Sequence, residues 1–266
     1  MRIQNADLFV FSPTGSTLKL SRAFIKKFEG YRINDLTTKK APRDYMAEED
    51  SLAVFAFPVY AGRVPEIFVK RIKNIHSNRA HAVIIGVYGN RAFDDSLLEM
   101  KDILEEKNFN VVAASAFLAQ HSYTDKVAGG RPDNIDMEIM EDFSEDIVDL
   151  LQNTDADAGF QLDLPGNRPY RQGIGKSEDA PYPGEGCISC GVCAMVCPVH
   201  IIEADGKMPE KNIPYCLHCL ACVKRCPMQV RVIHSDSIDG FKKYLIDNFS
   251  EIYKKPDLFI GKVLNS

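Results

Sequence analysis

Cysteine is absent from most of this chain: of its 266 residues, the eight cysteines all lie between Cys187 and Cys226. Long apolar runs are absent too, because runs such as Leu52–Phe57 and Ala82–Val87 fall far short of the ~20 residues that a membrane-spanning helix needs. The N-terminal residues lead directly into a short apolar segment instead of the longer core of a secretory signal. We therefore expect neither a membrane span nor a secreted protein.

A surplus of positive charge is also missing, since the formal net charge is −5. Nucleic-acid-binding domains usually show a basic surplus, so we do not expect nucleic acid as a main partner. The chain has no G-x-G-x-x-G fingerprint, which disfavours a self-contained NAD(P)H oxidase. Gly175-Lys176-Ser177 resembles the end of a P-loop, but Tyr170 stands where the first glycine is needed. The remaining composition, 45% hydrophobic and 26% charged, is that of an ordinary globular protein.

The cysteines form two copies of the spacing C-x2-C-x2-C-x3-C-P, which is that of bacterial ferredoxins. Three thiolates at every third residue of a tightly turning backbone can hold three corners of an iron–sulfur cube, and the fourth ligand must come from farther away. In two-cluster ferredoxins the fourth cysteine of each run binds the other cluster. We therefore assign one 4Fe-4S cluster to Cys187, Cys190, Cys193 and Cys226. The second cluster is assigned to Cys197, Cys216, Cys219 and Cys222.

Two other roles for the cysteines fit this spacing poorly. A disulfide framework is typical of small secreted chains. Zinc sites with four cysteines usually combine two C-x2-C pairs across a longer loop, which does not match two cysteine triplets that are each followed by Cys-Pro. Eight thiolates reserved for metal need a reducing compartment, so we expect a cytoplasmic protein.

Strand and helix patterns alternate through residues 1–150. Four mostly apolar runs predict strands: Leu8–Phe11, Leu52–Phe57, Ala82–Val87 and Val111–Leu118. Tyr31–Leu36 is predicted as a further, shorter strand. Apolar residues at helical spacing predict four helices: Thr17–Phe28, Pro65–Ile75, Asp94–Lys107 and Asn134–Leu151. The alternation indicates right-handed crossovers and a parallel sheet. We expect a doubly wound α/β fold with five parallel strands in the order 2-1-3-4-5.

Changes in composition divide the chain into four segments. We assign residues 1–152 to the α/β domain and residues 181–235 to a small α+β domain of the bacterial ferredoxin type. Residues 153–180 are polar with several glycines and prolines, which favours a linker or a strap along the first domain. Residues 236–266 form an amphipathic tail, for which we predict a helix that packs back on one of the domains.

Three loops would meet at the carboxyl edge of the parallel sheet, where open α/β sheets bind ligands. The first, Ser12–Thr17, offers hydroxyl and backbone N–H groups at a helix N-terminus and contains no lysine or arginine. This suits a phosphate monoester, although an ordinary Ser/Thr helix cap has the same composition. The second loop, Pro58–Pro65, and the third, Tyr88–Asp95, place aromatic beside small residues. They suit a planar ring, or they are plain turns.

The first loop resembles the S/T-x-T-G-x-T phosphate loop of flavodoxins, and the other two resemble the flavin-ring loops of that family. This resemblance implies that the phosphate of FMN is held by Ser12, Thr14, Gly15, Ser16 and Thr17. It implies flavin-ring contacts from Tyr60, Ala61, Gly62, Tyr88, Gly89, Asn90 and Arg91. Together with the cysteine runs, roughly residues 1–230 resemble the flavodoxin–ferredoxin fusion family, with FMN and two 4Fe-4S clusters as cofactors.

The sequence supports an electron-transfer function. FMN carries one or two electrons and each cluster carries one, so we expect electrons to pass between the clusters and FMN within the chain and to external redox proteins. The alternative is an enzyme: a flavin-dependent reductase of a small substrate, fed by its own clusters. A cluster-based oxygen sensor is a third hypothesis. We find no nucleophile motif with a base, and so assign no catalytic residue.

Three further features each have two interpretations. The predicted helix Asn134–Leu151 is strongly acidic, which indicates a solvated face or a docking surface for a basic redox partner. His218, between two cysteines of the second run, is either exposed or a hydrogen-bond donor to cluster sulfur. His121, after the fifth strand, either contacts flavin or substrate or makes a hydrogen bond within its loop.

Overall fold

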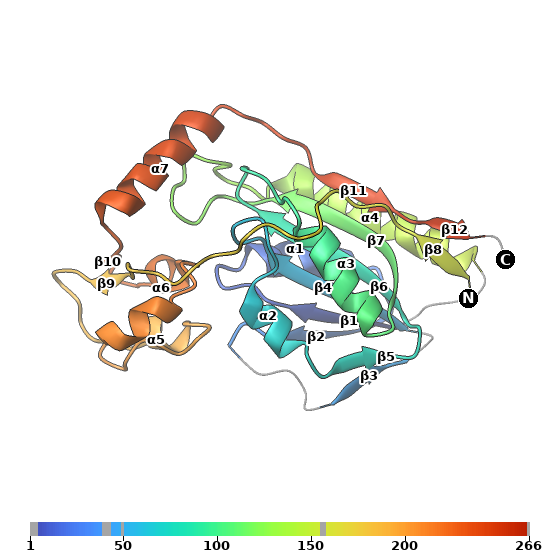
Figure 1. Ribbon diagram of the computed structural model, residues 1–266, viewed down its shortest axis with the longest axis horizontal. Helices are drawn as coiled ribbons and strands as arrows, with labels where there is room; N and C mark the ends of the chain where they lie inside the picture. Colours follow the sequence, from blue (N-terminus) through green and yellow to red (C-terminus); the bar gives the residue numbers. More distant parts are fainter. Residues whose placement is uncertain (1–4, 39–43, 49–50, 155–157, 265–266) are drawn as a thin grey trace.

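A computed structural model describes residues 5–38, 44–48, 51–154 and 158–264. Its largest feature is a six-stranded sheet with the order β11-β7-β6-β4-β1-β2 (Figure 1). The strands are β1 (Asn5–Val10), β2 (Gly30–Asp35), β4 (Ser51–Pro58), β6 (His81–Tyr88), β7 (Asn110–Leu118) and β11 (Asp257–Ile260). The first five are parallel and match the five predicted strands in chain order. The parallel part therefore has the order 2-1-3-4-5, that of the flavodoxin type.

The C-terminal tail differs from the single helix predicted over residues 236–266. Helix α7 covers Asp236–Phe249, and Pro256, which has no backbone N–H and cannot continue a helix, follows soon after. The chain then forms β11, which pairs antiparallel with β7, and β12 (Lys262–Leu264), which pairs with β8 (Gly159–Gln161). The sheet has six strands rather than the predicted five because β11 hydrogen-bonds the edge of β7 that five strands would leave open. The tail does pack back on the α/β domain.

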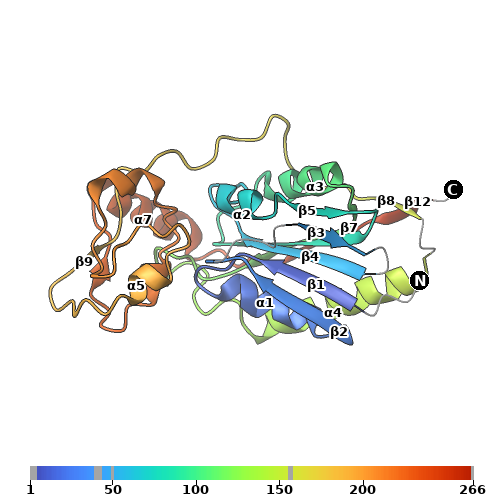
Figure 2. The same cartoon turned by 90° about the horizontal axis from the view of Figure 1, so that it is seen from below.

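Helices cover both faces of the sheet (Figure 2). One face carries α1 and α4, which pack against each other with the rings of Phe24 and Phe143 5.9 Å apart. The other face carries α2 and α3. Because β1, β4, β6 and β7 are buried from both sides, their sequences are nearly continuous apolar runs, whereas the edge strand β2 is partly exposed and half polar. The helices are α1 (Ser16–Ile25), α2 (Glu66–Arg71), α3 (Ser96–Glu106) and α4 (Asn134–Gln152).

The second predicted helix is shorter than expected. It was predicted over Pro65–Ile75, yet α2 ends at Arg71. Ile75 belongs instead to β5 (Ile75–Ser77), which pairs in parallel with β3 (Tyr45–Ala47) outside the main sheet. Ile75 is fully buried there. An apolar residue at this position can be buried in the core as part of a helix or of a strand. The spacing of apolar residues therefore could not distinguish the two.

The segment after β8 runs along the α/β domain before it reaches the cysteines (Figure 1). Asp95, just before α3, accepts hydrogen bonds from the backbone N–H groups of Asn167 (2.9 Å) and Arg171 (2.6 Å). Arg168 forms an ion pair with Asp102 of α3, with 2.5 Å between Nη2 and Oδ1. The segment is therefore tied to the first domain by charged and backbone contacts.

The cysteine-rich part is small and contacts the α/β domain. Nη2 of Arg71 donates to the carbonyl oxygen of Pro198, and Nε2 of His200 lies 3.1 Å from the carbonyl oxygen of Thr38. No helix in the described ranges is both long and apolar enough to cross a membrane. The elements of this part are β9 (Tyr182–Pro183), α5 (Val192–Met195), the 3-10 helix η1 (Glu210–Tyr215), α6 (Ala221–Lys224) and β10 (Arg231–Val232).

Candidate iron–sulfur and flavin sites

The eight cysteines surround two separate cavities. One is lined by Cys187, Cys190, Cys193 and Cys226. The other is lined by Cys197, Cys216, Cys219 and Cys222. Each cavity thus combines three cysteines of one run with the last cysteine of the other. These are the two sets assigned from the spacing, and their binding of clusters remains a prediction.

The two cysteine runs share one backbone conformation. Ser189 and His218, at equivalent positions, both have φ of 52°, and the residues just before the next helices, Gly191 (φ 75°) and Leu220 (φ 56°), also have positive φ. The left-handed backbone conformation is costly for residues other than glycine, so it needs support from the surrounding structure. Their repetition turns three successive thiols toward one cavity in each run.

The two cavities differ in access to solvent. Cys187 and Cys190 are exposed, whereas Cys219 and Cys222 are buried. Burial raises the pKa of Cys216 to about 11 and raises the pKa of Cys219 further. The second set of thiolates is therefore costly without a positive partner such as iron. At Cys226 burial is outweighed by hydrogen bonds from four backbone N–H groups, which lower the pKa of this thiol.

A third cavity, of about 600 Å³, lies at the carboxyl edge of the sheet. Its size is within the ~300–1,000 Å³ of small-molecule sites. Of the predicted FMN residues, eight line it: Thr14, Ser16, Tyr60, Ala61, Gly62, Tyr88, Gly89 and Arg91. Four do not: Ser12, Gly15, Thr17 and Asn90. The three loops therefore do converge, with part of each turned away from the cavity.

The first loop has the helix-cap role considered from its sequence, and its role in binding a phosphate remains a prediction. Oγ of Ser12 accepts a hydrogen bond from the backbone N–H of Leu18 (2.9 Å), so this hydroxyl serves helix α1. Gly15 has φ of 95° and precedes the first residue of the helix. Thr14 and Ser16 line the cavity. The first-turn N–H groups, which have no partner within a helix, remain suited to an anion.

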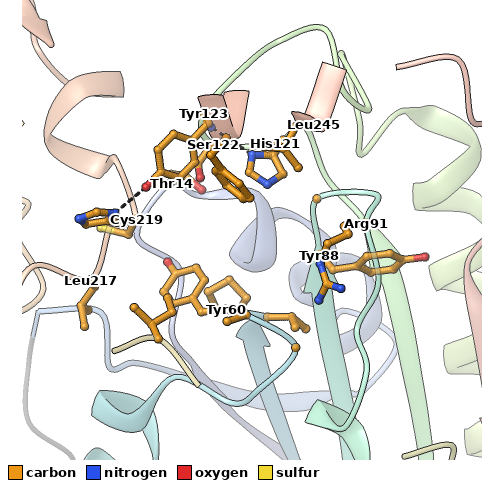
Figure 3. A pocket seen from close by; sticks show the side chains of 18 of the residues that line it. Thr14, Tyr60, Tyr88, Arg91, His121, Ser122, Tyr123, Leu217, Cys219 and Leu245 are labelled. Carbon is orange, nitrogen blue, oxygen red and sulfur yellow. Dashed lines mark hydrogen bonds between the residues drawn. The ribbon is translucent and has the colours of Figure 1, made fainter. Parts of the chain in front are cut away.

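Much of the cavity wall comes from segments outside the three loops, of whose residues only His121 was considered from the sequence as a contact of flavin or substrate. They are Ala119–Tyr123 after β7, Ile174–Asp179 of the strap, Leu217–Cys219 of the cysteine-rich part, and Phe241 and Leu245 of α7. Figure 3 shows Tyr60, Tyr88, Tyr123 and Cys219 around this space. Composition and spacing do not reveal such a wall, because it depends on how distant segments pack.

The interpretation of His218 as an exposed side chain was wrong. Its Nδ1 lies 2.7 Å from the hydroxyl of Tyr123, and its Nε2 lies 2.7 Å from the carbonyl oxygen of Asp179. Because a carbonyl only accepts, Nε2 carries the proton and Nδ1 accepts from Tyr123. Ser177 also contacts Nε2. His218 thus joins the cysteine loop to the α/β domain and to the strap.

His121 provides a neutral aromatic wall. Burial, together with the charges of Lys224 and Arg91, lowers the pKa of His121 to about 4. Its Nδ1 accepts a hydrogen bond from the backbone N–H of Tyr123 (3.2 Å), and its ring contacts that of Phe241. The local hydrogen bond is therefore present, and His121 also lines the cavity, while its contact with flavin or substrate remains a prediction.

Asn90 is held by the C-terminal tail rather than turned to the cavity. Its Nδ2 donates to the carbonyl oxygens of Phe249 (3.0 Å) and Ile252 (2.7 Å). In return, Nζ of Lys254 donates to the carbonyl oxygens of Asn90 and Arg91, both at 2.7 Å. The tail thereby fixes the third loop in place.

Comparison with known proteins bears on the cysteine-rich part. Residues 186–230 match the 4Fe-4S dicluster domain family. The chain is 36% identical to pyruvate synthase subunit PorD of Thermotoga maritima over 73 aligned residues. The alignment covers 27% of this chain and 74% of that protein. The chain belongs to the 4Fe-4S dicluster ferredoxin family. Its dicluster domain follows an α/β domain of flavodoxin-like fold, as the strand order shows.

Solved flavodoxins align with the part of the chain that precedes the dicluster domain. A flavodoxin of Streptococcus pneumonia TIGR4 aligns with 55% of this chain and 99% of its own, at 14% identity and a TM-score of 0.39. A Fusobacterium nucleatum flavodoxin bound to flavin mononucleotide aligns with 55% of this chain and 98% of its own, at 16% identity and a TM-score of 0.38.

The dicluster domain places a cation beside the first loop, Ser12–Thr17. A Cβ atom built on Gly15 would lie 3.4 Å from Nη2 of Arg225, which follows α6. Among the residues that the structure describes, this guanidinium has no hydrogen-bond or ion-pair partner. A loop without lysine or arginine of its own thus gains a positive charge from the other domain.

The acidic side chains of α4 lie away from these sites, on the outer surface of the helix layer. The exposed ones are Glu138, Glu141, Asp142, Glu145, Asp146 and Asp149. Lys27 of the neighbouring segment pairs with Glu145, with 2.6 Å between Nζ and Oε1. A docking role for this surface remains a prediction.

Proposed function

We propose that this protein transfers electrons between two 4Fe-4S clusters and FMN within one chain and exchanges them with external redox proteins. The observation that carries the proposal is the shared wall of the large cavity. Residues Leu217–Cys219 line it together with the flavodoxin-type loops, and Cys219 also lines the second cysteine cavity. The cavity assigned to one cluster and the cavity assigned to FMN are therefore neighbours.

The residues present suit both kinds of cofactor. Eight thiols around two cavities match two cubane clusters, each of which supplies one-electron chemistry. Tyr60 and Tyr88 offer aromatic walls for a flavin ring, and Thr14 and Ser16 offer hydroxyls near the helix N-terminus for its phosphate. The chain's own part is to hold these groups close together and to exclude water from the space between them.

External redox proteins can reach the chain at the first cysteine cavity. Cys187 and Cys190 are exposed there, as are the apolar side chains of Ile188 and Met228. Three of the four cysteines at the second cavity (Cys197, Cys219 and Cys222) are buried, so we infer that partner proteins exchange electrons at the first. The Thermotoga relative is a pyruvate synthase subunit, which favours a redox enzyme as the partner. A reducing cytoplasm fits eight free thiols.

The first test is the content of iron, acid-labile sulfide and flavin in anaerobically purified protein. We expect about eight iron and about eight sulfide per chain, with a single FMN. Full iron without flavin, even after incubation with FMN, would contradict internal transfer and leave a ferredoxin beside an inert α/β domain. Fewer than about four iron would contradict the two-cluster assignment.

A second candidate function is reduction of a small substrate at the flavin. It is favoured by the extra walls of the cavity, since the strap and α7 enclose space beyond the flavin loops. Turnover of a small acceptor by the isolated, chemically reduced protein would support it. Reduction of partner proteins alone, across a panel of quinones and nitroaromatic acceptors, would favour the carrier function.

Arg225→Gln is expected to weaken FMN binding about tenfold, because a charge-assisted contact to the phosphate is lost at an exposed position. Riboflavin has no phosphate, so its affinity should not change. Both affinities are measured by flavin fluorescence with flavin-depleted protein that retains its clusters.

Arg22→Gln is the matched control for this substitution, because Arg22 is exposed on α1 and its loss changes the net charge equally. The control should bind FMN as the unmodified protein does. Equal weakening of FMN and riboflavin by Arg225→Gln would show that Arg225 joins the two domains instead of contacting phosphate.

A further inference from the structure

Arg231 is a buried cation without a protein counter-ion. It lies on β10 in the dicluster domain and is 3% exposed. Its Nη1 donates to the carbonyl oxygen of Gly206 (2.6 Å) and its Nη2 to that of Pro181 (2.7 Å). Its Nε is buried and has no hydrogen-bond partner. Within the described ranges no carboxylate pairs with it. Such a charge is costly unless an anion lies beside it.

The guanidinium faces the first set of cysteines. Arg231 lines the first cavity, and a Cβ atom built on Gly206 would lie 3.4 Å from Sγ of Cys193, 3.9 Å from Nη1 of Arg231 and 4.0 Å from Sγ of Cys187. The missing anion is thus expected where the cluster thiolates gather.

We propose that Arg231 is the internal counter-ion of the iron–sulfur clusters and that its charge raises the reduction potential of at least one of them. The proposal rests on the clusters of the proposed function. One electron from an external reductant adds one negative charge to a cluster. A fixed cation in a region of low dielectric constant stabilises that reduced form more than the oxidised form.

The test is a redox titration of the anaerobic, cluster-loaded protein, followed by electron paramagnetic resonance. In Arg231→Gln, the equilibrium constant for reducing at least one cluster should fall about tenfold, or about 59 mV for a one-electron couple. Arg231→Lys keeps the charge and should retain most of the original potential. Lys211→Gln also removes one positive charge, but from an exposed position of η1 where solvent screens it. This substitution should leave both potentials unchanged.

Several outcomes decide the proposal. Unchanged potentials in Arg231→Gln with full iron would overturn it, as would an equal shift in Arg231→Lys. If Arg231→Gln fails to assemble clusters and Arg231→Lys assembles them, the counter-ion role is supported. If neither assembles them, Arg231 acts through its two carbonyl contacts and the proposal is overturned. Unmodified protein without clusters would refute the proposed function along with this inference, whereas loaded protein with unchanged potentials refutes the inference alone.

Discussion

Replacing Cys197 with alanine is expected to remove the cluster of the second cysteine run, although Cys197 belongs to the first run. Cys197 lines the same cavity as Cys216, Cys219 and Cys222. A cubane with three protein ligands is far less stable than one with four, so the iron content should fall from about eight to about four per chain. Iron and sulfide analysis under anaerobic conditions, with electron paramagnetic resonance of the reduced protein, measures the loss.

Paired substitutions distinguish crossed ligation from ligation within each run. If ligation is crossed, C197A/C216A damages a single cluster and keeps about four iron, whereas C197A/C190A damages both and keeps almost none. Ligation within each run predicts the reverse result for the same two proteins. The pair is therefore internally controlled, because both variants lose two cysteines of one small domain.

Asn90→Asp is expected to detach the C-terminal tail from the third flavin loop. The substitution keeps the shape of the side chain but turns a donor toward two carbonyl oxygens into an acceptor at a site that is 1% exposed. An unpaired buried charge costs about 3 kcal/mol or more. Amide hydrogen exchange of residues 249–260 should therefore accelerate about 100-fold, and FMN affinity should fall because the loop also lines the cavity.

Asn248→Asp is the matched control for the tail. Nδ2 of Asn248 donates to the carbonyl oxygen of Tyr244 (2.8 Å) from an exposed position on α7. The same chemical change can there be hydrated, so exchange in the tail should stay close to that of the unmodified protein. Unaltered protection of residues 249–260 in Asn90→Asp would contradict the role given to Asn90.

The parallel sheet was predictable because each buried strand needs a continuous apolar run, and such runs are visible in the sequence. The sixth strand was not, since Leu258-Phe259-Ile260 is short and follows an amphipathic helix. What makes it a strand is the open edge of β7, which lies more than a hundred residues earlier in the chain. Local propensity carries no information about such a partner.

The sequence by itself indicated which thiols line each of the two cysteine cavities, because both runs match the bacterial ferredoxin spacing. It also determined which loops meet at the sheet edge, because parallel strands bring their carboxyl ends together. Tertiary structure alone decided that Leu217–Cys219 and α7 line the large cavity beside the three loops, and that His218 bonds to Tyr123. It likewise decided that Arg231 is buried without a carboxylate. These features depend on the docking of two domains, and packing across an interface leaves no periodic pattern in either segment.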